Sequence, residues 1–158
     1  MLTLMYSVLI SLLIIVNSWG LGALVNHLLK KIAFYKTLSG NVLIKNDRWN
    51  KILGLGLFKF LVSKTFYAKL DPSLKIASGG YQELARVKTV MINSEIGHFI
   101  GLISSQLVFA GMYMRNNNAS LLLIGTLFNI LMNLYPILLQ QQNQSRINSI
   151  LKTYFSKV

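Results

Sequence analysis

The sequence contains no cysteine and few acidic residues. Without cysteine, disulfides, thiol catalysis and zinc sites built from Cys are excluded. The acids are Asp47, Asp71, Glu83 and Glu95, and there are two histidines, so few side chains can do acid–base chemistry. Charged residues make up 13% of the chain, against about 25% in an ordinary soluble domain. Much of the surface is therefore expected to face something other than water.

Positive charge is in large excess, with 16 Lys and Arg against 4 acids and a formal net charge of +12. Such basicity indicates either nucleic acid or an anionic membrane surface as partner. No nucleic-acid-binding module accompanies the charge, whereas 53% of the residues are hydrophobic. We therefore expect membrane lipids, and no nucleic acid, as partners.

Three long apolar runs occupy residues 2–29, 96–114 and 119–139. Each is close to or above the roughly 20 residues that cross a bilayer as a helix, and none shows the alternation of barrel strands. No Lys or Arg precedes the first run, which favours an uncleaved span over a signal peptide. Because only residues 115–118 separate the last two runs, these should form an antiparallel hairpin.

The predicted fold is therefore a single all-α integral membrane domain over residues 1–158, with about three transmembrane helices and a C-terminal helical hairpin. A basic segment, 30–94, and a tail, 140–158, lie outside the spans. Within the basic segment, residues 49–63 are apolar but short and interrupted by two lysines. That stretch is either an interfacial helix, a re-entrant piece or a short fourth span.

The distribution of Lys and Arg predicts the orientation. Twelve of the 16 lie between Lys30 and Lys88, three lie in the tail, and the turn has only Arg115. Since basic segments stay in the cytoplasm, the middle segment and the C-terminus should be cytoplasmic and the N-terminus outside. The expected location is the cell inner membrane, as a multi-pass protein.

Glu95 and His98 form the first candidate site. Ionisable groups at membrane depth are candidates for function, and positions i and i+3 share one helix face. A Glu beside a His fixes its tautomer and raises its affinity for a proton, which suits a general base. The competing interpretation is an interfacial ion pair at the end of the span. Metal-binding bundles need two such motifs and further carboxylates, so no metal is expected.

A polar stripe on the third span and beyond forms the second candidate site. Its amides either join helices or line a site for a sugar or headgroup. The hairpin brings the end of the stripe to the level of Glu95, where a cation could hold an anionic donor. The candidate substrate-binding residues are Asn129, Asn133, Gln140, Asn143 and Arg146.

This combination resembles the glycosyl-4,4'-diaponeurosporenoate acyltransferase family, small bacterial membrane proteins associated with the last step of staphyloxanthin-type carotenoid synthesis. The resemblance covers roughly residues 45–152, and its motif is an ending similar to NxYPxxxQRYNRxR. Here residues 133–146 read NLYPILLQQQNQSR. The Asn, Tyr-Pro, Gln, Asn and last Arg agree, whereas Gln141, Gln142 and Gln144 replace Arg, Tyr and Arg.

The resemblance implies transfer of a fatty acyl group from an activated donor such as acyl-CoA to a sugar hydroxyl on a glycosylated lipid or carotenoid. His98 would take the hydroxyl proton with Glu95 orienting it, and Gln140 or Asn143 would donate to the oxyanion. With no Cys and no G-x-S-x-G motif, direct transfer is expected. No cofactor is implied beyond the acyl donor as co-substrate.

A second hypothesis is a non-catalytic membrane subunit or scaffold. It would use the same amides for helix packing and its hairpin to hold a partner. A channel or transporter would require oligomers, because three helices enclose little space. A homo-oligomer and a hetero-oligomer both stay open.

Overall fold

The computed structural model describes residues 2–31, 35, 54–64 and 80–155, and the regular structure in these residues is helical. Three helices are long and apolar enough to cross a membrane. The predicted all-α class with three spans is thereby confirmed. The elements are α1 (Leu2–Leu29), α4 (Leu55–Lys64), α6 (Tyr81–Asn116), α7 (Ala119–Asn129), the π-helix η2 (Ile130–Leu134) and α8 (Tyr135–Phe155).

The chain divides into two units, which are described separately. The first contains Met1–Leu38 and Ile96–Ile137, and so includes α1, most of α6, α7 and η2. The second contains Ser39–Glu95 and Leu138–Val158, and so includes α4, the start of α6 and most of α8.

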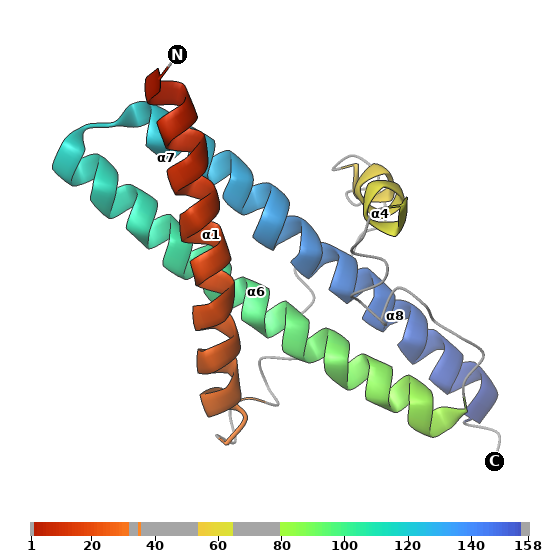
Figure 1. Ribbon diagram of the computed structural model, residues 1–158. Coiled ribbons are helices and arrows are strands. Elements are labelled where there is room, and N and C mark those ends of the chain that lie inside the picture. Colours follow the sequence, from red (N-terminus) through yellow and green to blue (C-terminus); the bar gives the residue numbers. More distant parts are fainter. Residues whose placement is uncertain (1, 32–34, 36–53, 65–79, 156–158) are drawn as a thin grey trace. The chain divides into compact units, whose positions relative to one another are not determined.

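The turn of the hairpin lies in the first unit and consists of two asparagines between α6 and α7 (Figure 1). Asn117 has a φ of 49°, in the left-handed region that Asn tolerates better than most residues. Asn118 caps α7, because its side chain accepts a hydrogen bond from the backbone N–H of Leu121 at 3.0 Å. The turn therefore reverses the chain with local hydrogen bonds, and the hairpin prediction is confirmed.

The core of the first unit joins its helices around Phe109. This ring is fully buried with Ile15 of α1 and Leu121 of α7, and α1 packs along α7 (Figure 1). Gly125 faces the ring so closely that a Cβ there would lie 2.6 Å from its carbons. The two helices of the hairpin thus pack together where Phe109 of α6 meets Gly125 of α7.

One face of α1 is made mostly of small and polar residues, whereas its leucines are largely exposed. Small residues allow helix backbones to approach closely, and close packing holds helices together in a bilayer. At Gly22 the approach is tight enough that a Cβ would collide with the carbonyl oxygen of Gly97 on α6. The buried residues of this face are Ser7, Ser11, Ile15, Ser18, Gly22 and Asn26.

The core of the second unit is aliphatic. Leu84, Val87 and Met91 follow one another on α6 at helical spacing and bury their side chains with Ile147 of α8. Three and four residues apart on a helix share one face, so this part of α6 presents an apolar stripe. The same stripe reaches Glu95 four residues after Met91.

Helix lengths refine the predicted boundaries. The 36 residues of α6 span about 54 Å, more than a hydrocarbon core of about 30 Å. The helix therefore begins well before the apolar run 96–114. By contrast, the 10 residues of α4 span only about 15 Å. The helix α4 is too short to cross the bilayer. It covers the second part of the apolar stretch 49–63, whose residues 49–53 lie outside the described residues.

Candidate active site

His98 of α6 meets a side chain from each of two other helices. Its Nδ1 lies 3.1 Å from Oδ1 of Asn133 in η2. The indole of Trp19 on α1 packs edge-on against the imidazole, with ring centroids 6.1 Å apart. Trp19 also donates its Nε1–H to the same Oδ1 at 3.1 Å. Residues from two other stretches of the chain therefore converge on the imidazole.

The hydrogen bonds of Asn133 determine which ring nitrogen of His98 carries the proton. An indole N–H can only donate, so the Asn133 atom that it meets must be the oxygen. Nδ2 of Asn133 in turn donates to Oδ1 of Asn129 at 2.8 Å, in agreement with that assignment. Since Oδ1 can only accept, Nδ1 of His98 donates, and the lone pair of a neutral imidazole is then on Nε2.

The network continues from Asn133 into the hairpin. Asn129 donates its Nδ2 to the backbone oxygen of Leu102 at 2.9 Å and to Oε1 of Gln106 at 3.2 Å. Gln106 donates to Oγ1 of Thr126 at 3.0 Å. These side-chain hydrogen bonds join α6 to α7. Buried networks of this kind specify a single arrangement of helices. The position of Asn133 is therefore set by several helices together.

Asn133 lies in the π-helix η2, a departure from regular geometry that is often found at functional sites. The backbone N–H of Tyr135 bonds to the oxygen of Ile130, five residues back. Pro136 follows immediately, and proline has no N–H and clashes with the carbonyl four residues before it in a regular helix. The wider π turn accommodates the proline, and the side chain of Asn133 is fully buried there.

Glu95 is held in the second unit by two amides of α8. Its Oε1 accepts from Nε2 of Gln141 at 2.6 Å, and its Oε2 accepts from Nε2 of Gln144 at 2.7 Å. Glu95 is 7% exposed, and both glutamines are buried. These two positions are the ones at which the family-like ending has arginines. The structure therefore assigns them to Glu95, with neutral donors in place of cationic ones.

The remaining predicted site residues lie on α8. Gln140 and Asn143 are buried, whereas Arg146 is exposed. Burial lowers the pKa of Lys59 on α4, and the positive charge of Arg146 lowers it further. The two cationic side chains therefore lie close enough for the charge of Arg146 to act on Lys59.

The structure brings together some of the predicted residues and adds others. His98, Asn133 and Asn129 form one hydrogen-bonded series, and the amides of both asparagines are used internally. Their role as substrate ligands stays a prediction. Trp19, Gln106 and Lys59 were not among the predicted site residues, and Gln141 and Gln144 were identified only as departures from the motif. The motif itself was the available signal for these glutamines.

Metal ligation finds no support in the described parts of the chain. Within residues 2–31, 54–64 and 80–155, no three His, Cys, Asp or Glu side chains are grouped so as to hold an ion. The chemistry that the site offers is hydrogen bonding and proton transfer.

These features define a helical membrane protein that holds a histidine, through its Nδ1, among buried amides. The family model for glycosyl-4,4'-diaponeurosporenoate acyltransferase matches residues 31–153. The chain belongs to this family of acyltransferases in carotenoid biosynthesis. No curated protein and no solved structure matches the chain.

Proposed function

We propose that the protein transfers a fatty acyl group from acyl-CoA to a sugar hydroxyl of a glycosylated carotenoid or related lipid, with His98 as the general base. The observation that carries this proposal is the bond from Nδ1 of His98 to Asn133. With Nδ1 engaged as donor, Nε2 is the atom that accepts a proton. A base of this kind is what a weakly nucleophilic sugar hydroxyl requires.

In the proposed reaction, Nε2 of His98 removes the hydroxyl proton while the sugar oxygen attacks the carbonyl carbon of the thioester. The new ester bond forms as the carbon–sulfur bond breaks, and the departing thiolate takes the proton from the imidazolium. Asn133 holds the ring through both protonation states, because its Oδ1 accepts from Nδ1 in each. The assignment of Gln140 or Asn143 to the oxyanion stays a prediction from the motif. No acyl-enzyme is needed, in keeping with a chain without cysteine.

The anionic part of the donor is proposed to bind near Arg146 and Lys59. Both side chains are cationic, and the pKa of Lys59 is lowered first by burial and then by repulsion from the charge of Arg146. A phosphate group would offset that repulsion and accept hydrogen bonds from the guanidinium. This proposal extends the sequence-based role of Arg146 by one residue that only the structure could add.

The proposed topology follows from the Lys and Arg distribution. The N-terminus lies outside, and α8 ends in the cytoplasm, where acyl-CoA is made. The inner membrane is the proposed location. This orientation is supported by the basic segment 30–94 and by the single Arg115 in the turn.

The direct test is reconstitution of the full chain in phosphatidylcholine vesicles with a glycosylated carotenoid acid and palmitoyl-CoA. Formation of the acylated glycoside, detected by mass spectrometry and absent without protein, is expected. Pigment profiles of cells with and without the gene provide the parallel test in vivo. Unchanged acyl products in both experiments would contradict the proposal and favour the non-catalytic scaffold, for which the Asn129 network would serve helix packing alone.

A further inference from the structure

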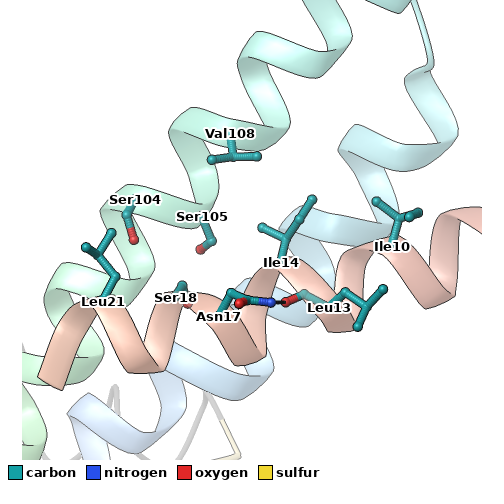
Figure 2. A pocket seen from close by; sticks show the side chains of 9 residues that line it. All are labelled: Ile10, Leu13, Ile14, Asn17, Ser18, Leu21, Ser104, Ser105 and Val108. Carbon is teal, nitrogen blue, oxygen red and sulfur yellow. Dashed lines mark hydrogen bonds between the residues drawn. The ribbon is translucent and has the colours of Figure 1, made fainter. Parts of the chain in front are cut away.

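A pocket of about 450 Å³ lies between α1 and α6 in the first unit (Figure 2). Its volume is within the range of about 300–1,000 Å³ that small-molecule sites occupy. Leu13, Leu21 and Val108 at its edge are between 45% and 58% exposed, so the pocket opens on the surface that faces lipid. The lining residues are Ile10, Leu13, Ile14, Asn17, Ser18, Leu21, Ser104, Ser105 and Val108.

The lining contains no charged side chain, and each of its polar side chains donates a hydrogen bond within its own helix. Ser18 donates to the oxygen of Ile15 at 2.7 Å, and Asn17 donates to Leu13 at 2.8 Å. On α6, Ser104 and Ser105 both donate to Gly101, at 3.2 and 2.6 Å. A hydrocarbon occupant would therefore leave the three serine hydroxyls hydrogen-bonded, whereas a charged occupant would find no countercharge.

The pocket adjoins the histidine site through Gly101. A Cβ at this glycine would lie 3.2 Å from Oγ of Ser18, in the pocket wall, and 3.0 Å from Oδ1 of Asn133, which holds His98. Gly101 thus lies between Ser18 in the pocket wall and the amide of Asn133 in the histidine site. A chain lying in the pocket would have one end at the level of His98 and the other toward Ile10 and Val108.

The volume of the pocket is similar to that of one hydrocarbon chain. At about 30 Å³ for each water-sized group, 450 Å³ holds roughly 15 such groups, and a methylene is of similar size. One unbranched fatty acyl chain has about this volume, whereas a polyene with its sugar has a larger volume than the pocket. We propose that the pocket binds the fatty acyl chain of the donor, entering sideways from the bilayer, with its thioester directed to His98. This inference rests on the proposed function.

The first experiment measures binding without catalysis. The full-length His98→Ala variant in phosphatidylcholine vesicles is irradiated with palmitoyl-CoA that carries a diazirine near the end of its acyl chain. Labelled peptides are then identified by mass spectrometry. Labels within residues 10–21 and 104–108 that unlabelled palmitoyl-CoA removes are expected. Labels elsewhere, or labels that do not compete, would overturn the pocket proposal even if the active protein transfers acyl groups.

The second experiment measures chain-length selectivity. Val108→Trp fills the pocket, and Leu107→Trp is the matched control, since Leu107 is 68% exposed and outside the lining. With octanoyl-, lauroyl- and palmitoyl-CoA, Val108→Trp should lower kcat/KM for the longest donor about tenfold relative to the shortest, and Leu107→Trp should not. Equal selectivity in both variants would refute the pocket as the acyl site. Specific labelling of the His98→Ala variant, together with no acyl transfer by the unaltered protein, would refute the proposed function and retain the pocket.

Discussion

Asn133 and His98 are joined side chain to side chain, with Nδ1 of the imidazole 3.1 Å from the amide oxygen. The two residues are 35 positions apart, and they meet because the hairpin folds α6 back along η2. The bond assigns the proton to Nδ1 and the lone pair to Nε2. A histidine that only marked the end of a span would need no such partner at depth.

Replacing His98 should abolish acyl transfer while the protein stays inserted. Loss of a positioned general base typically lowers the rate by about 10²–10⁴-fold, so we expect His98→Ala to fall in that range in vesicles. His98→Gln tests the same point with a side chain of similar polarity that cannot act as a base. The control is His27→Ala, because His27 is exposed near the end of α1. Near-full activity in both His98 variants would make the histidine structural.

Replacing Glu95 should mainly affect stability. Glu95→Ala removes the acceptor of two buried amides, at Gln141 and Gln144, each worth about 1–3 kcal/mol. A lower Tm in detergent is therefore expected, and Glu95→Gln should be milder. Glu83→Ala is the control on the same helix, because Glu83 pairs with Arg86 on the exposed surface. Equal changes in Tm for Glu95→Ala and Glu83→Ala would contradict the role of this cluster.

Arginine should be tolerated at position 144. A guanidinium can donate to the carboxylate that Gln144 now contacts at 2.7 Å, and charge-assisted bonds are the stronger kind. Gln144→Arg should therefore keep the Tm or raise it, and the combination with Glu95→Gln should remove any gain. A large loss of folded protein in Gln144→Arg alone would argue against this pairing.

Arg146 should matter for the donor and not for the acceptor. Because its side chain is exposed, Arg146→Ala should raise the KM for palmitoyl-CoA only by roughly two- to fivefold, and less at high salt. Arg115→Ala is the matched control, since Arg115 is an arginine in the last turn of α6, beside the hairpin turn. Similar kinetics for the two variants would remove Arg146 from the proposed donor site.

At the contact between α1 and α6, Gly22 should tolerate no added methyl group. Gly22→Ala places a Cβ against the carbonyl oxygen of Gly97, and overpacking of this kind costs about 1–3 kcal/mol. Gly20→Ala is the control two residues away, where a Cβ would meet nothing within 4 Å. The Tm of each variant in detergent checks the prediction, which would be wrong if Gly20→Ala were as destabilising as Gly22→Ala.

The sequence by itself determined the spans and the hairpin. Apolar runs long enough to cross a bilayer can form only helices there, and two asparagines between α6 and α7 leave no other course than reversal. It also indicated Glu95 and His98, because ionisable groups are costly at membrane depth. Local composition and spacing suffice for such properties.

Tertiary structure decided which groups meet. Trp19 and Asn133 are 114 residues apart, and nothing in the local pattern of either predicts their contact. The π turn before Pro136 adds one residue to a helical turn. Residues after this turn therefore lie on a different face from the one that regular helical spacing predicts. Glu95 meets Gln141 and Gln144, two residues that the motif marked only as departures from the family pattern. The tautomer of His98 depends on a bond that exists only once three helices pack together.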